Sequence, residues 1–423
     1  MKKIILLLLF INSLLLAQVE SSQFIVPRSY ARLIDFDIAD YKSNITGKTR
    51  VDVFIEVPYS RIQFVKSGNN YIAKYNLTVS FFDEDGKMVT ERMWKEKVIT
   101  NKFNLTSSPA SSNLSYKTFN LSPGKYNFVC DLEDLDSRKT YKVKSKTTVL
   151  DFSDSLEISD IVLISKVLKT EKGDKIIPNV SQTVSTIDSS IAFFFEIYSD
   201  SNRTVKIIYA IRDQNGTQNG SKATELKLKK GKNVIYQNLT GIKFQLGEYD
   251  LLVQINDLNG NNLKALGKRF ISKIFGFPFN ITNLDTAVEQ MVYIASQSDI
   301  SYIEDAKSYN EKLKRFIAFW KKKDPSPNTV ENEILNEYYR RVAYANAHFR
   351  SYYDGWKTDM GMIYITLGPP NQVERQPVAI DSKPYEVWQY YEINKTFIFV
   401  DQTNFGDYRL LNPIFGDWYR YRQ

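Results

Sequence analysis

The chain has 423 residues, 43% of them hydrophobic, a length that exceeds what one hydrophobic core usually supports and predicts two to four domains. Its formal charge of +8 is spread along the sequence without a dense basic block, which argues against a protein that binds a nucleic-acid backbone. The single cysteine, Cys130, excludes an internal disulfide, and the single histidine, His348, excludes His-pair metal sites and most catalytic triads.

The first residues have the pattern of a secretory signal. Lys2 and Lys3 precede an apolar run at 4–10, and a second short run ends at Ala17. This segment is too short and too interrupted for a comfortable membrane span, although a single anchor helix is the alternative. We therefore expect a signal peptide at 1–17 and an exported protein, located in the periplasm, at the outer membrane or outside the cell. No transmembrane span is expected after cleavage.

Two β-rich units follow, at residues 24–150 and 156–275. Each contains about five to seven short strand-like segments, separated by clusters of Asn, Asp, Gly, Ser and Pro. This spacing is typical of an antiparallel sandwich of the immunoglobulin-like kind. The sequence therefore predicts two such sandwiches, with the connection between them near 151–156.

The two units are similar to each other in sequence. Three pairs of segments match in the same order: 54–60 with 194–200, 81–87 with 210–217, and 124–135 with 247–258. The second pair contains Asp-Gly and Asn-Gly, which are strong hairpin signals, and the third shares Gly-X-Tyr and Asp-Leu at the same spacing. Ordered matches of this kind indicate an internal duplication.

The alignment of the units also predicts the role of two kinds of side chain. Tyr126 and Tyr249 each follow a turn glycine, so we expect their hydroxyls to bond backbone at a corner of the sandwich. Cys130 aligns with Val253. A cysteine that interchanges with valine on a strand is most simply a buried apolar residue rather than a reactive thiol.

After Pro278 the apolar period changes to that of a helix, and three helices are expected. The first, capped from Thr282 or Asn283, should bury Leu284, Ala287, Val288, Met291, Val292 and Ala295. The second should bury Tyr309, Leu313, Phe316, Ile317 and Trp320. The third, capped by Asn328 or Thr329, should bury Ile334, Leu335, Tyr338, Val342, Ala345 and Phe349, with His348 packed or exposed near its end.

The last part of the chain is rich in aromatic residues, which number 20 among the 86 residues from 338 to 423. Their alternation predicts antiparallel strands at 362–367, 385–391, 397–400 and 408–411, with Asn394-Lys395 in a tight turn. The helices would pack on the apolar face of this sheet. We favour a core built from large rings over an exposed platform for sugars.

The most conspicuous motif in this part is Gly355-Trp356-Lys357-Thr358-Asp359. We interpret it as a structural corner in which Gly355 permits a positive φ and Trp356 plugs the junction between the third helix and the sheet. Thr358 and Asp359 would close a turn through their side chains. The alternative is a recognition surface made of Trp356, Asp359, Arg375 and Trp388 beside the turn Gly368-Pro369-Pro370.

The order of several blocks resembles the bacterial family named for its GWxTD motif. The blocks are FWKKKDPSPNT (319–329), ENEILNEYYRRVAYANAHF (331–349), DGWKTDMGMIYITLGPPNQVE (354–374), YEVWQYY (385–391) and FGDYRL (405–410). The resemblance covers roughly 285–423 and implies an exported chain with paired β units, but no particular activity. Met360 stands where family members commonly have an arginine, so any pairing by that arginine is lost. The Gly-Pro-Pro and Trp-X-Tyr stretch is also similar to small envelope modules that help to assemble outer-membrane proteins.

The predicted fold class is multidomain and mainly β, with two immunoglobulin-like antiparallel β-sandwiches followed by helices packed on a small antiparallel sheet at 280–423. Phosphate-binding glycine loops, a GxSxG elbow and a Cys-His pair are missing from the sequence, so we expect no cofactor, no metal and no catalytic residue.

The leading functional expectation is an exported, non-catalytic cell-envelope protein that acts as a protein-interaction or structural module with an unidentified envelope partner. The first alternative is a protein that binds glycan or peptidoglycan through exposed aromatic rings. The second is a hydrolase that uses carboxylates of the terminal module. Its candidate residues are Asp354, Asp359, Glu374, Glu386 and Asp401.

Overall fold

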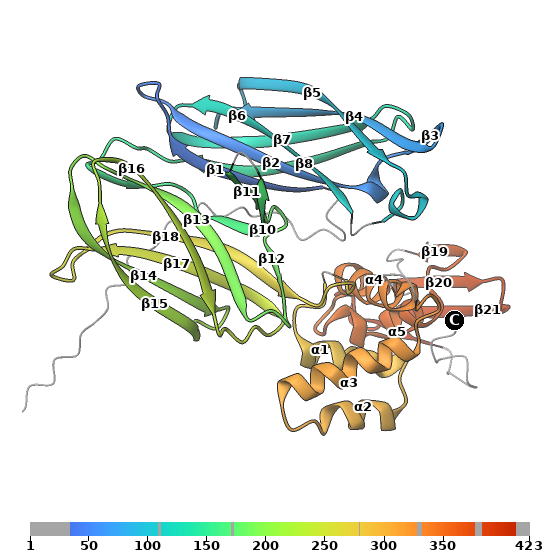
Figure 1. Ribbon diagram of the computed structural model, residues 1–423. Helices are drawn as coiled ribbons and strands as arrows, with labels where there is room; N and C mark the ends of the chain where they lie inside the picture. Colours follow the sequence, from blue (N-terminus) through green and yellow to red (C-terminus); the bar gives the residue numbers. More distant parts are fainter. Residues whose placement is uncertain are drawn as a thin grey trace, which may run out of the picture.

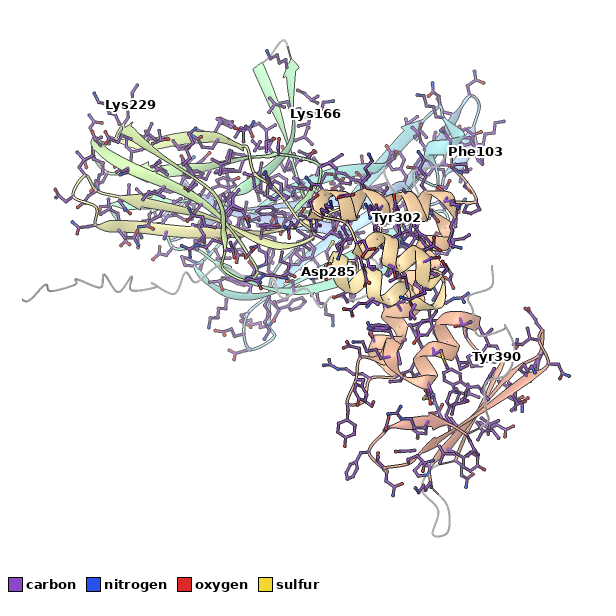
Figure 2. All side chains as sticks on the ribbon, turned by 90° about the horizontal axis from the view of Figure 1, so that it is seen from below. Phe103, Lys166, Lys229, Asp285, Tyr302 and Tyr390 are labelled. Atoms are coloured by element: carbon purple, nitrogen blue, oxygen red, sulfur yellow. The ribbon has the colours of Figure 1, made fainter. Side chains whose placement is uncertain are left out.

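The computed structural model describes residues 34–411 apart from 109–110, 171–172, 279, 328–331 and 377–382. The segment expected to be a signal peptide, 1–17, lies outside these residues. Two β-sandwiches are followed by a module of helices and a four-stranded sheet (Figure 1). The helices lie between the sandwiches and the terminal sheet (Figure 2). Among the described residues, no helix has the length and apolar character needed to cross a membrane.

The first sandwich consists of a three-stranded sheet, β1-β2-β6, and a five-stranded sheet, β3-β4-β7-β8, in which β5 also pairs with β4. Every pair is antiparallel. Along β7, buried and partly exposed residues alternate, because one face of the strand meets the core. The bounds are β1 Asp35–Lys42, β2 Thr49–Pro58, β3 Val65–Ser67, β4 Asn70–Phe82, β5 Met88–Thr100, β6 Ser112–Leu121, β7 Gly124–Asp134 and β8 Thr140–Val149.

The second sandwich has the sheets β11-β10-β13-β16, with β9 also paired to β13, and β12-β18-β17-β14-β15. Its fold is immunoglobulin-like, and its strand orders β10-β13-β16 and β18-β17-β14-β15 correspond to β1-β2-β6 and β8-β7-β4-β5 of the first sandwich. One pair departs from the expected antiparallel pattern, since β12 runs parallel to β18. The bounds are β9 Leu156–Ile158, β10 Val162–Thr170, β11 Gly173–Pro178, β12 Thr183–Ser185, β13 Ser190–Ser199, β14 Arg203–Asp213, β15 Gln218–Leu228, β16 Gly231–Thr240, β17 Gly247–Asn256 and β18 Asn262–Lys273.

The segments that match in sequence lie at equivalent positions of the two sandwiches. The first pair contains the ends of β2 and β13, the second forms the β4–β5 and β14–β15 turns, and the third contains β7 and β17. The expected tyrosine bonds are confirmed, with opposite polarity: the Tyr126 hydroxyl donates to the Ser122 carbonyl at 2.9 Å, whereas the Tyr249 hydroxyl accepts from the Gln245 N–H at 2.8 Å. Cys130 is fully buried, and burial raises its pKa to about 12, which confirms an inert apolar role.

The sandwiches are joined by buried polar contacts of β1. Asp37, 1% exposed, forms an ion pair with Lys268 of β18 at 2.6 Å and accepts a hydrogen bond from Gln182 at 2.8 Å. The Asp40 N–H donates to the Asp160 carboxylate at 2.9 Å, and the Asp160 N–H donates to the Asp40 carbonyl at 3.1 Å. These bonds fix β1 of the first sandwich against the segment that precedes β10 in the second.

The carboxyl groups at this interface have raised pKa values. Burial raises the pKa of Asp37, Asp40 and Asp160, and the pKa of Asp160 rises to about 6. At Asp40, the neighbouring Asp160 charge raises the pKa further. One oxygen of Asp37 and one of Asp40 are buried without a hydrogen-bond partner among the described residues. A small apolar cluster of Ala39, Tyr41 and Val162 completes the contact.

The helical segment contains α1 Leu284–Glu289, a 3₁₀ turn η3 Gln290–Tyr293, α2 Gln297–Glu304, α3 Tyr309–Lys322 and α4 Glu333–His348. Asn283 caps α1 by accepting from the Thr286 N–H at 2.9 Å, as expected. Leu246 and Ile274 of the second sandwich belong to the helical core, and the Leu246 N–H donates to the Tyr309 hydroxyl at 2.7 Å. The helices are therefore packed directly onto one end of this sandwich.

Three details of the predicted helices are wrong. The first helix stops at Glu289, and Val292 is 48% exposed because the 3₁₀ turn rotates it away from the core. A further helix, α2, follows from Ser296, whose side chain and Asp299 form a capping box. Helix α4 is capped by Asn332, whose side chain accepts from the Leu335 N–H at 3.0 Å. The caps expected there, Asn328 and Thr329, lie outside the described residues.

The terminal sheet has the order β19-β20-β21-β22 and is antiparallel throughout. Its strands are β19 Gln372–Gln376, β20 Tyr385–Tyr390, β21 Lys395–Asp401 and β22 Tyr408–Leu410. The strand predicted at 362–367 is instead part of helix α5, Asp359–Leu367. A short apolar run that is buried on all sides does not distinguish strand from helix, and here the cap at Thr358 starts a helix.

Candidate functional site: the corner around Gly355–Asp359

Gly355 is required by close packing rather than by backbone conformation. It lies in the 3₁₀ turn η4 Gly355–Lys357, and it is not among the glycines with positive φ, so that expectation is wrong. A Cβ at Gly355 would lie 1.9 Å from the Ala345 carbonyl oxygen in α4. A Cβ at Gly361 would lie 1.9 Å from the carbonyl oxygen of Gly355 itself. The two glycines thus allow α4, η4 and α5 to touch backbone to backbone.

Trp356 is buried within this corner, at 7% exposure. Its ring belongs to the core of the helical segment, together with residues of α1, α3 and α4, and not to the cluster beneath the sheet. The Trp356 N–H donates to the Asn346 side chain at 3.0 Å, and its carbonyl accepts from the Tyr293 hydroxyl at 2.8 Å. The side chain is a plug, as expected, but it fills the space between helices.

Thr358 and Asp359 begin helix α5. The Thr358 hydroxyl donates to the Gly355 carbonyl at 2.7 Å and accepts from the Gly361 N–H at 3.0 Å, which closes the turn and caps the helix. Asp359 has a different role from the predicted one, because its carboxylate accepts from the Leu410 N–H of β22 at 2.8 Å. It joins the start of α5 to the last described strand.

The turn Gly368-Pro369-Pro370 ends helix α5. Gly368 has φ 83° and accepts a hydrogen bond from the buried Tyr390 hydroxyl at 2.8 Å. The Arg341 guanidinium also lies close to Gly368, and a Cβ added there would be 3.2 Å from it. Pro369 is exposed and Pro370 is half-buried.

The recognition surface considered as the alternative, made of Trp356, Asp359, Arg375 and Trp388, is not formed. Trp388 is 2% exposed and packs in the cluster between α5 and the sheet, so both tryptophans are internal. Arg375 is exposed on β19 and pairs with Glu386 of β20 at 2.9 Å, and the Trp388 ring N–H donates to the same Glu386 at 3.0 Å. The rings of this part form a core, which Figure 2 shows at Tyr390 between the helices and the sheet.

Met360 occupies the position where the resemblance predicts an arginine. Its side chain is 5% exposed and contacts the same apolar cluster as Tyr364 and Trp388. In this chain the position therefore contributes packing between α5 and the sheet, and brings no charge to the corner.

The carboxylates considered for hydrolysis have structural partners or stand at the surface. Asp401 is buried and accepts from the N–H groups of Thr403 and Gly406, and these bonds outweigh burial and lower its pKa. Glu374 is exposed beside Gln372, and Asp354 is exposed. The described residues contain no group of three or more His, Cys, Asp or Glu side chains placed to hold a metal ion.

His348 lies at the end of α4, exposed and stacked on the Tyr344 ring at a centroid distance of 3.9 Å.

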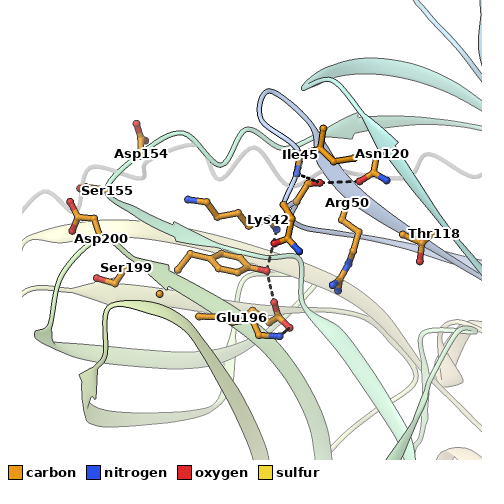
Figure 3. Close-up of a pocket in the computed structure, with 15 residues that line it drawn as sticks. Lys42, Ile45, Arg50, Thr118, Asn120, Asp154, Ser155, Glu196, Ser199 and Asp200 are labelled. Carbon is orange, nitrogen blue, oxygen red and sulfur yellow. Dashed lines mark hydrogen bonds and ion pairs between the residues drawn. The ribbon is translucent and has the colours of Figure 1, made fainter.

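A second candidate region, which the sequence did not indicate, lies between the two sandwiches. It is an open cleft of about 770 Å³ whose walls come from the outer faces of β2 and β6 on one side and β13 and β16 on the other (Figure 3). Its lining residues are mostly of polar types and include Lys42, Arg50, Glu196 and Lys232. No sequence motif marks it, because it exists only where two separate sheets face each other.

Comparison with known proteins gives matches of two kinds. Solved structures that match include a β-glucuronidase of Bacteroides uniformis, with 13% identity, a TM-score of 0.21 and coverage of 54% of this chain and 27% of that one. A transglutaminase of red sea bream matches with 10% identity, a TM-score of 0.18 and coverage of 57% and 32%. The chain spans less than a third of the length of these proteins, and likenesses this distant say nothing about activity. A search of curated proteins finds no match.

The family comparison agrees with the resemblance seen in the motif. The model of the GWxTD domain matches residues 258–411. The match begins in the turn before β18, earlier than the sequence blocks suggested. This earlier start includes Ile274, which directly follows β18 and belongs to the helical core. The carboxy-terminal module of this chain, with its close-packed Gly355–Asp359 corner, is a GWxTD domain.

Proposed function

We propose that this is an exported, non-catalytic protein of the cell envelope that acts as a protein-interaction or structural module. The observation that carries the proposal is that the motif residues make their contacts within the fold. These residues are Gly355, Trp356, Thr358 and Asp359. Groups that serve a substrate have to remain available to it. Because these groups are engaged internally, the corner supports a scaffold better than an active site.

The joints between the parts of the chain support the same proposal. The first sandwich is tied to the second by the buried Asp37–Lys268 ion pair, and the second to the helices by Leu246 and Tyr309. Joints of this kind suit a protein that presents its surfaces in a fixed arrangement. We further propose that the two sandwiches arose by duplication, supported by the matched segments at equivalent strands and by the paired tyrosine corners.

The proposal is tested by crosslinking the full chain in its own cells and identifying the products by mass spectrometry. We expect a reproducible set of envelope proteins. Retention on cell-wall polysaccharide with no protein product would instead support the glycan-binding alternative. Recovery of only cytoplasmic proteins would contradict the proposed location.

The proposed export is tested separately, by amino-terminal sequencing. The amino-terminal sequence of the protein purified from the envelope fraction should begin near Gln18, because the signal segment is removed. A protein that retains Met1 and stays in the cytoplasmic fraction would show that the first residues are not a cleaved signal.

A further inference from the structure

The two sheets that border the cleft between the sandwiches face each other across it. The Lys42 N–H of the first sandwich donates to the Tyr198 hydroxyl of the second at 3.1 Å. Burial and the nearby Glu196 charge of the second sandwich both raise the pKa of Asp52 in the first. Phe54 and Phe194 both pack on the apolar cluster at the junction. Because β2 and β13 are the central strands of these walls, their neighbours β6 and β16 form the outer part of each wall.

Both walls carry the same aromatic pair. Phe54 of β2 lies opposite Tyr116 of β6, with ring centroids 6.1 Å apart, and Phe194 of β13 lies opposite Tyr236 of β16 at 5.8 Å. The tyrosines are well exposed, at 62% and 54%, and Val234 beside Tyr236 is 42% exposed. These rings lie next to the cleft rather than in its lining, on the same sheet faces as Thr118 and Glu196, which do line it. Exposed aromatic residues that recur on two facing sheets are the kind of anchor that protein interfaces use.

Strand β16 is an edge strand with little protection against pairing. The edge strands β5, β8 and β15 carry several charged side chains each, which hinder the addition of another strand. On β6, the other strand at the cleft, the Arg92 guanidinium bonds the Thr118 carbonyl at 2.9 Å. In contrast, β16 has ten residues, one charged residue, and β13 as its only strand partner among those described.

The charges at one end of the cleft indicate what a partner segment would carry. Lys42 is exposed and makes no ion pair within the described chain. Arg50, in contrast, pairs with Asp52 of its own strand at 3.3 Å and lies over the Tyr41 ring. The acidic groups nearby are already matched, since Glu196 bonds Lys232 at 3.2 Å and Tyr198, and Asp154 bonds Lys264 at 2.8 Å. A carboxylate on the partner would complement the Lys42 ammonium group.

We propose that β16 is a docking strand, on which an extended segment of a partner protein pairs by β-addition and places alternate side chains in the cleft. The segment would have apolar side chains at every second position, against Val234 and Tyr236, and an acidic residue at the end beside Lys42. This inference rests on the proposed function and names the surface and the partner chemistry for it.

The test uses the full mature chain and a phage-displayed library of random linear peptides. We expect selected peptides to show alternating apolar residues and one acidic residue. Binding of such a peptide should slow amide hydrogen exchange in β16 and leave β15 unchanged, because only the first strand gains hydrogen bonds. Tyr236→Lys should weaken binding by about tenfold or more, as loss of an aromatic anchor does.

The matched control is Tyr352→Lys, because Tyr352 is 74% exposed and lies beyond the end of α4, away from the cleft. Equal loss of binding in both variants, or exchange protection outside β16, would overturn the inference. A second probe, the acidic polysaccharide polygalacturonate, distinguishes the ligand class: saturable binding that Tyr116→Ala and Tyr236→Ala abolish would assign the cleft to glycan instead. If crosslinked envelope partners map to the terminal domain, the proposed function stands and the β16 surface is wrong.

Discussion

The interface between the two sandwiches and the corner of the GWxTD domain are both buried, but different forces stabilise them. The interface holds Asp37, Asp40, Asp160 and Lys268 away from water, and one oxygen each of Asp37 and Asp40 has no hydrogen-bond partner among the described residues. The corner brings backbone against backbone through two glycines, and its polar groups are bonded. Stability of the first region should therefore depend on charge and pH, and that of the second on shape.

The largest effect in the corner is expected from Trp356→Ala. Removing a large buried ring leaves a cavity among the helices and should lower the free energy of unfolding by about 3 to 5 kcal/mol. Chemical denaturation of the full chain measures this. A variant of unchanged stability that has lost a crosslinked partner would show that the ring recognises a ligand.

At the interface, Lys268→Met should cost a similar amount, about 3 to 5 kcal/mol, because it leaves the Asp37 carboxylate buried without its cation. The paired replacement Lys268→Met with Asp37→Leu should recover much of the loss, since two apolar side chains need no partner. Failure of the double variant to recover stability would mean that the interface depends on the polar contacts to Gln182 as well.

Gly355→Ala tests whether the corner depends on shape alone. An added methyl group would collide with the backbone of α4, which has to shift, and we expect a loss of about 1 to 3 kcal/mol or more. Gly220→Ala is the matched control, because its Cβ would lie 3.3 Å from a side-chain atom of Ile242 that can move. Equal stability of the two variants would contradict the close-packing argument.

The pH dependence of the interface follows from its raised carboxyl pKa values. A carboxyl whose pKa rises on folding, from 3.8 to about 6 for Asp160, disfavours the folded state once it ionises, so its cost appears between about pH 4 and pH 6 and persists above. Asp160→Asn should therefore stabilise the protein at pH 7.5, by about 1 to 3 kcal/mol, and have little effect at pH 4. Thermal unfolding of both proteins across this range measures the difference; equal pH profiles would contradict it.

The smallest effect is expected at the tyrosine corners. Tyr126→Phe and Tyr249→Phe each remove one hydrogen bond and should cost about 0.5 to 1.5 kcal/mol. The loss should be larger for Tyr249→Phe, because the Gln245 N–H then lacks its acceptor, whereas the Ser122 carbonyl has a second lone pair. The reverse order, measured by denaturation, would contradict this expectation.

The sequence by itself determined the features that depend on local pattern. Alternation along strands, turn pairs such as Asp-Gly, and apolar stripes at helical spacing gave the fold class, the buried Cys130 and the helices α3 and α4. The motif blocks identified the terminal module. Local pattern was insufficient at 362–367, where a buried apolar run suits either a strand or a helix.

Only the tertiary structure decided the features that join distant segments. The need for Gly355 comes from α4, the partner of Asp359 lies in β22, and the exposure of Val292 follows from a 3₁₀ turn. The Asp37–Lys268 pair joins the first strand of one sandwich to the last strand of the other. The cleft, with Phe–Tyr pairs on the sheets beside it, appears only when two sheets face each other. Contacts of this kind leave no periodic signal along the chain, since their partners are set by packing in space.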